Sequence, residues 1–208
     1  MPLFAGCHVI AVDALMPNAA RALQTFAAAP PSEKFGSWLQ RLHVFNNAVG
    51  NTRGNVTLSF VANNPGTSRV GEFDVTDANS YTVSSLVMED LLYHTPPAQR
   101  PHITLGDGSV VPLQPRHVYM VKVELEGYDV AALHGLRRLL MEDERPEAVQ
   151  LQLAVIHTPL TALPCNAVDL VRFMYGQGYV YEDTPMREMV ASVNATDVTR
   201  AFEGWWRL

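Results

Sequence analysis

The stretch of residues 118–140 limits the fold of this chain more than any other. It opens with an apolar run, residues 118–123, which is followed by Glu124, Glu126 and Gly127. Apolar residues then recur at spacings of three and four, as they do on the buried face of a helix. A buried strand that ends in acids and a glycine before a helix is typical of ligand sites in open α/β sheets. We therefore expect chemistry at Glu124 and Glu126.

A structural role for the same residues is the alternative. Glu126 would then complement the dipole of the following helix, and Gly127 would relieve a tight turn. One unit of strand, acid, glycine and helix is a weak signal, so the pattern alone leaves both interpretations open.

The composition is that of an ordinary globular protein and excludes several classes of function. The 208 residues suffice for one domain with a sizeable core. A net charge of −6 with scattered basic residues argues against nucleic-acid binding. The sequence has no membrane-spanning apolar run and no secretory signal, so we expect a cytoplasmic protein without a membrane partner. Cys7 and Cys165 are far apart, which favours a reducing compartment, and no spacing predicts a metal site.

Strands and helices are predicted to alternate along the chain. Short β-branched or alternating runs predict strands at residues 7–12, 43–48, 55–62, 148–157 and 179–181. Helical patterns begin near Pro17 and span residues 130–140 and 167–175. Residues 95–116 form a proline- and glycine-rich insert, in which the run Gly106–Gly108 suggests a hairpin. This alternation predicts an α/β domain with a mainly parallel sheet.

Six segments of the chain fit one family pattern in order. The segments are V-I-A-V-D-A-L (9–15), V-F-N-N-A-V-G (44–50), P-G-T-S (65–68), V-S-S-L-V-M-E-D-L-L (83–92), V-K-V-E-L-E-G-Y-D (121–129) and L-V-R-F-M-Y-G-Q-G-Y (170–179). Together they cover roughly residues 7 to 182 and resemble the FkbM family of S-adenosylmethionine-dependent methyltransferases.

The resemblance implies a Rossmann-like class I methyltransferase sheet, mainly parallel with helices on both faces. It also implies methylation of a hydroxyl on a small molecule or glycan, with S-adenosylmethionine as cofactor. Asp13 would bind the ribose hydroxyls, since a carboxylate accepts two hydrogen bonds from a cis-diol. Asn47 and Ala48 would lie near the adenine. Glu124 and Glu126 would edge the crevice, and Glu124 is the preferred base for the hydroxyl proton.

The chain departs from the family pattern at three places. The first central strand and the glycine-rich cofactor loop should precede Val9 and are expected to be missing. Glu124 stands where the family usually has Asp, and residues 153–156 are apolar where a glutamate is usual. We therefore expect residues 1–183 to form a truncated methyltransferase domain, with residues 184–208 as a tail packed on it.

These departures support an alternative function. The chain would be a catalytically inactive, truncated methyltransferase-fold protein that acts as a structural or protein-interaction module. In that case the exposed sheet edge beside the missing strand would bind a protein partner or cause self-association, because unpaired strand edges recruit other strands.

Overall fold

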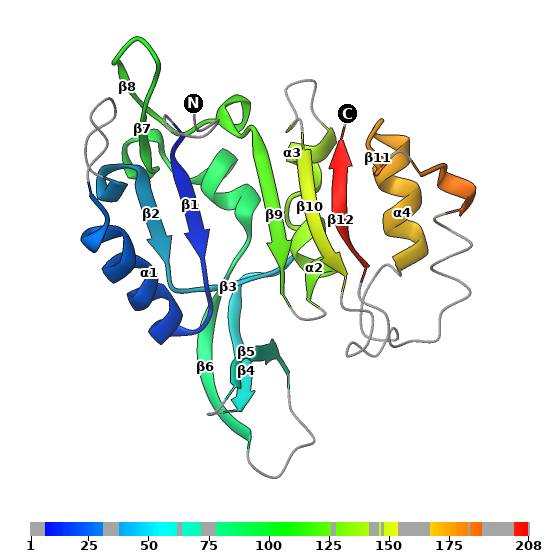
Figure 1. Ribbon diagram of the computed structural model, residues 1–208, viewed down its shortest axis with the longest axis horizontal. Coiled ribbons are helices and arrows are strands. Elements are labelled where there is room, and N and C mark those ends of the chain that lie inside the picture. Colours follow the sequence, from blue (N-terminus) through cyan, green and yellow to red (C-terminus); the bar gives the residue numbers. More distant parts are fainter. Residues whose placement is uncertain are drawn as a thin grey trace.

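The computed structural model describes residues 7–30, 38–61, 64–71, 78–125, 128–141, 146, 148–153, 167–182, 184–188 and 202–207. Their strands form four sheets, two of two strands and two of four (Figure 1). None of the helices in these ranges is long and apolar enough to cross a membrane.

The first sheet consists of two parallel strands joined by a helix. Strand β1 (Val9–Val12) pairs with β2 (Leu42–Phe45), residue for residue from Val9 opposite Leu42. Helix α1 (Met16–Ala28) connects them, and its Pro17 stands in the first turn, where the missing N–H costs nothing. A short 3-10 helix, Trp38–Arg41, leads into β2. The predicted first strand and the helix starting near Pro17 are confirmed.

The second sheet is mixed and has the strand order β11-β12-β10-β9. Strand β9 (Met120–Glu124) runs parallel to β10 (Ala148–Leu153), whereas β12 (Phe202–Arg207) lies antiparallel between β10 and β11 (Val180–Tyr181). The intervening helices are α2 (Asp129–His134), α3 (Arg137–Met141) and α4 (Ala167–Gly176).

The largest buried core lies between the second sheet and its helices. It combines side chains from β9, α2, α3, β10, α4 and β12, together with Ile103 and Leu113 from the region predicted as an insert. Leu139, Leu140, Val149, Val171, Met174 and Tyr179 are all completely buried in it. Burial of so many large side chains is the main stabilising contribution in this half of the chain. Ile10 of β1 also packs against this core.

The third sheet is mostly antiparallel. Strand β4 (Gly54–Val61) pairs over its whole length with β6 (Ala78–Leu86) and on its other edge with β5 (Asn64–Val70). Strand β3 (Ala48–Val49) adds a short parallel contact to β6. Leu15, Ala48, Leu58 and Val83 form its own small core.

The fourth sheet is the predicted hairpin. Strands β7 (His102–Thr104) and β8 (Val110–Pro112) are antiparallel around a turn in which Gly108 has a φ of 87°. That conformation favours glycine, which explains why this short local signal was readable in the sequence. Three further short turns of helix span Asp90–His94, Pro97–Gln99 and Pro115–His117.

The predicted Rossmann-like sheet, mainly parallel with helices on both faces, is wrong. The chain is α/β, but its described strands are divided among small sheets, of which one is a parallel pair, two are mixed and one is an antiparallel hairpin. Two physical causes account for the difference. Strands β4 and β6 pair with each other as an antiparallel ladder instead of each pairing in parallel across a helix. No described strand links β1 to β9, so the two parallel pairs remain in separate sheets.

Several predictions fall outside the described residues. Glu126 and Gly127, Cys165, and the end of the predicted strand 148–157 with its His157 belong to this group.

Candidate functional site

The candidate site lies at the carboxyl end of β1, where Asp13 follows the last strand residue. The Asp13 N–H donates to the Phe45 carbonyl oxygen at 3.1 Å, which continues the pairing with β2. Asp13 Oδ1 accepts a hydrogen bond from the Leu15 N–H at 2.7 Å. This contact is a local turn of the type that aspartate forms with the residue two positions on. The carboxylate is therefore fixed at the strand end, with one oxygen engaged by the chain's own backbone.

Two asparagines occupy the corresponding end of β2. Asn46 Nδ2 donates to the carbonyl oxygens of Asp13 and Ala14, each at 3.0 Å. Asn47 Nδ2 donates to the Ser84 carbonyl oxygen at 3.2 Å, and Ala48 after it is buried. The structure thus brings Asp13 and Asn47 to neighbouring strand ends. Asn46 was not predicted, although its place in an Asn-Asn pair after a strand was a readable signal.

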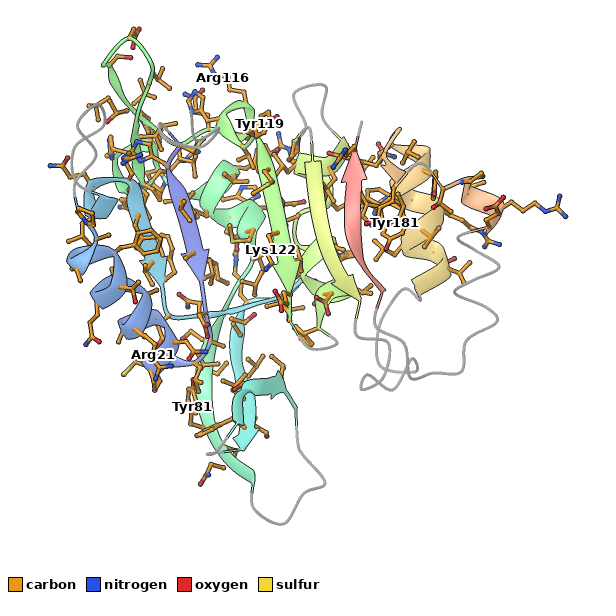
Figure 2. All side chains as sticks on the ribbon, in the orientation of Figure 1. Arg21, Tyr81, Arg116, Tyr119, Lys122 and Tyr181 are labelled. Atoms are coloured by element: carbon orange, nitrogen blue, oxygen red, sulfur yellow. The ribbon has the colours of Figure 1, made fainter. Side chains whose placement is uncertain are left out.

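Tyr81 of β6 completes this cluster from a segment distant in sequence. Its hydroxyl donates a hydrogen bond to the Ala14 carbonyl oxygen. Burial raises the pKa of Tyr81, and the negative charge of Asp13 adds to this effect. Figure 2 shows Tyr81 emerging from β6 beside the start of α1. The cluster therefore has a protonated phenol close to an acid and two amides.

Glu124 is the last residue of β9 and lies at the surface. Its Oε2 is 2.8 Å from Lys122 Nζ, and the two side chains are 45% and 53% exposed, respectively. An exposed pair of this kind contributes little to stability, so Glu124 can exchange its partner at small cost. No hydrogen bond or ion pair within the described ranges joins Glu124 to Asp13. The structure places both at carboxyl ends of strands but does not bring their side chains together.

The backbone just after Glu124 is held by an acid that the sequence analysis missed. Asp129, in the first turn of α2, is 1% exposed, and its Oδ1 accepts a hydrogen bond from the Leu125 N–H at 2.9 Å. An acid in the first turn of a helix is also favoured by the helix dipole. Asp129 therefore has a structural role in fixing where β9 ends.

A surface pocket of about 460 Å³ lies elsewhere, around α3. None of the predicted site residues is among its lining residues. Glu89 accepts a hydrogen bond there from the Arg138 N–H, and the Arg138 guanidinium stacks over the Tyr93 ring at 4.0 Å. These contacts tie the segment after β6 to α3. The lining residues are Asn51, Val87, Glu89, His134, Gly135, Arg137, Arg138 and Met141.

Histidines gather at the opposite, amino-terminal ends of β1 and β2. The rings of His8 and His43 stack at 5.7 Å, and His8 Nε2 accepts a hydrogen bond from the Thr104 N–H at 2.8 Å. Burial lowers the pKa of His8, as do the charges of His43 and Arg41. Burial likewise lowers the pKa of His43. Within the described residues, no three metal-ligating side chains are arranged to hold a metal ion.

Comparison of the chain with protein-family models, curated proteins and solved structures found no match.

Proposed function

We propose that this protein binds S-adenosylmethionine at the carboxyl ends of β1 and β2 and transfers its methyl group to a hydroxyl, as in the FkbM-type methyltransferases that the sequence resembles. The observation that carries the proposal is the position of Asp13 and Asn47 at the ends of two adjacent segments, tied together by Asn46. Ligands of α/β proteins bind at such carboxyl ends.

The side chains at this end suit the nucleoside part of the cofactor. Oδ1 of Asp13 already accepts one hydrogen bond, from Leu15, and the carboxylate retains acceptor capacity for a ribose diol. The side-chain nitrogen of Asn47 donates a hydrogen bond to the Ser84 carbonyl oxygen. The side-chain oxygen of Asn47 can then accept a hydrogen bond from the adenine amino group. The cofactor supplies an electrophilic methyl group when bound.

Glu124 is the proposed base for the acceptor hydroxyl. It lies at the end of β9, and the arrowheads of β1, β2 and β9 point toward the same side of the molecule (Figure 1). Its exposed pairing with Lys122 leaves it accessible to an acceptor. Glu126, which lies outside the described residues, remains a proposed second acid. The acceptor is a small-molecule or glycan hydroxyl, and a cytoplasmic location remains a prediction.

A second candidate is a protein-interaction module without catalysis. The observation that favours it is that β1 and β9 each have one edge without a partner strand among the described residues, because unpaired edges recruit additional strands.

Calorimetric titration with S-adenosylhomocysteine tests the first proposal. The informative variant is Asp13→Asn, which keeps an oxygen for the Leu15 N–H but removes the charge and one acceptor. Loss of a charged hydrogen bond should weaken binding about tenfold or more. Asp169→Asn is a matched control, since Asp169 is an exposed acid of α4 that pairs with Arg172.

The outcomes separate the two candidates. Saturable binding that is lost in Asp13→Asn and kept in Asp169→Asn supports the cofactor site and justifies screening of acceptors. Absence of binding by a chain with a cooperative unfolding transition would overturn the methyltransferase proposal.

A further inference from the structure

The surface pocket of about 460 Å³ around α3, the α3 pocket, is separate from the proposed cofactor site, because Asp13, Asn47 and Glu124 are not among its lining residues. Three segments that are distant in the sequence line it. They are the turn after β3, the residues that follow β6, and the region from the end of α2 through α3. Small-molecule pockets usually measure about 300–1,000 Å³, so the volume suits a small organic ligand.

Hydrogen bonds and an ion pair hold these three segments together. The Glu89 N–H donates to the Gly135 carbonyl oxygen at 3.1 Å, and Glu89 Oε1 accepts a hydrogen bond from the Arg138 N–H. Arg53 Nε and Nη2 contact the two carboxylate oxygens of Asp90 at 2.6 and 2.5 Å, which joins the turn after β3 to the segment after β6. A pocket whose walls are already tied together loses little conformational freedom when a ligand binds.

The described lining of the α3 pocket carries more positive than negative charge. Arg137 and Arg138 contribute two guanidinium groups and His134 an imidazole, whereas Glu89 is the acid among these lining residues. The whole chain, in contrast, has a formal net charge of −6. A mainly cationic pocket in an acidic chain attracts an anion to this position on the surface.

The two arginines differ in their surroundings. The Arg138 guanidinium lies 4.0 Å from the centre of the Tyr93 ring, and this stacking restricts its orientation. Arg137 is exposed, and its side chain makes no hydrogen bond or ion pair with another described residue. Because the fork of a guanidinium binds carboxylate or phosphate oxygens in pairs, Arg137 is the residue best suited to hold an anionic group.

The α3 pocket also has an apolar wall, formed by Val87 and Met141. The Met141 side chain is 49% exposed, although methionine is more often buried. A ligand with an apolar body would cover this side chain, and the flexible thioether chain of methionine adapts readily to the shape of what it contacts.

We propose that the α3 pocket binds a small organic anion, whose carboxylate or phosphate group is held by Arg137 and Arg138 and whose apolar body lies on Val87 and Met141. Carboxylate and phosphate share one recognition chemistry, the paired N–H donors of a guanidinium. Glu89 opposes the anion by its charge, but its hydrogen bond to the Arg138 N–H fixes the start of α3. The site uses none of the residues proposed for methyl transfer, so either activity can fail without the other.

An NMR titration of the full chain, followed at the backbone N–H groups of Gly135 and Arg138, tests the proposal. The probes are phenyl phosphate, benzoate and benzamide, of which benzamide has the shape of benzoate without its charge. Both N–H signals should shift saturably with at least one of the two anions and show no saturable shift with benzamide. The tighter anion identifies the preferred acidic group. The Gly108 N–H, in the turn of the β7–β8 hairpin, is the internal control and should not shift.

Four variants test the residues that the proposal names. Arg137→Gln should weaken anion binding about tenfold or more, because a charged hydrogen bond is lost. Arg137→Lys keeps the charge without the fork, so its affinity should lie between the two. Arg21→Gln removes an exposed arginine of α1 and should leave binding unchanged. Glu89→Gln retains an acceptor for the Arg138 N–H but removes the opposing charge, so it should tighten binding.

Four results would overturn the proposal, each in a chain whose urea midpoint is unchanged. The first is the absence of a saturable shift with both anions, and the second is equal binding of benzamide and benzoate. The third is equal affinity of Arg137→Gln and the parent chain for the tighter anion. The fourth concerns S-adenosylhomocysteine, which should bind Arg137→Gln and the parent chain equally. Loss of that binding in Arg137→Gln would mean that the α3 pocket is not a separate site.

Discussion

A Cβ atom on Gly135 would lie 2.2 Å from the carbonyl oxygen of Gly50. Gly135 follows α2, and Gly50 follows β3, so this contact brings the third sheet against the helices of the second. Such an approach is open only to a residue without a side chain.

Gly135→Ala should destabilise the protein by about 2–4 kcal/mol, since rigid backbone atoms would have to move apart. The measurement is the free energy of unfolding in urea. Gly176→Ala is the control, because its Cβ would meet nothing within 4 Å near the end of α4. An alanine there should be neutral or slightly stabilising. Equal effects of the two substitutions would contradict the close contact.

Trp206→Ala should lower the free energy of unfolding by about 3–5 kcal/mol, as large-to-small changes in a core do. Trp206 is 1% exposed, and its ring lies 5.3 Å from the rings of both Tyr175 and Tyr181. Thermal unfolding followed by circular dichroism provides the measurement. Met186→Ala, at a side chain that is 46% exposed, should have a small effect. A tolerated Trp206→Ala would mean that β12 does not hold the second sheet together.

Asp129→Ala should destabilise the chain by about 1–3 kcal/mol, because the Leu125 N–H loses its buried acceptor. Asp129→Asn keeps an acceptor oxygen and should recover part of the loss. Denaturant unfolding of the two variants gives the comparison. If both variants were as stable as the parent chain, a structural role for this carboxylate would be excluded.

Stability should fall when the pH is lowered below about 6.5, the ordinary histidine value, because the folded-state pKa values of His8 and His43 are lowered. Between the folded and unfolded pKa values the unfolded chain binds more protons, so stability rises with pH. Urea midpoints from pH 5 to 8 measure this dependence. His43→Gln should flatten the pH profile, and an equally steep profile in that variant would contradict the prediction.

The sequence predicted local structure well where the signal was itself local. The hairpin β7–β8 depends on the turn around Gly108, and strand β4 depends on its alternating residues. Both patterns can be recognised within a window of about ten residues of the sequence. Strand β12 was missed because Glu203 and Gly204 interrupt its apolar pattern, and its partner β10 lies some 50 residues away. The arrangement of strands into sheets is set by such distant pairings, which is why the predicted parallel sheet failed.

The same distinction applies to the candidate site. Asp13 and Asn47 were proposed as site residues because the family resemblance assigns cofactor contacts to their positions. Tyr81 was missed because it binds the carbonyl oxygen of Ala14, 67 residues away, and a backbone carbonyl produces no pattern in the sequence. Asn46 was missed although the Asn-Asn pair that contains it was visible in the sequence. Asp129 was missed because a helix-start acid is common on exposed surfaces, whereas here it is buried.

The position of β12 between β10 and β11 has a consequence for the order in which the protein folds. Strand β12 follows β11 in the chain, yet it separates β11 from β10 in the sheet. During synthesis, β10, α4 and β11 emerge before the strand that joins them, so the second sheet closes only after residues 202–207 have left the ribosome. Long-range pairing of this kind slows folding. Until that last step, β10 lacks its antiparallel neighbour and the Tyr175 ring of α4 lacks its contact with Trp206.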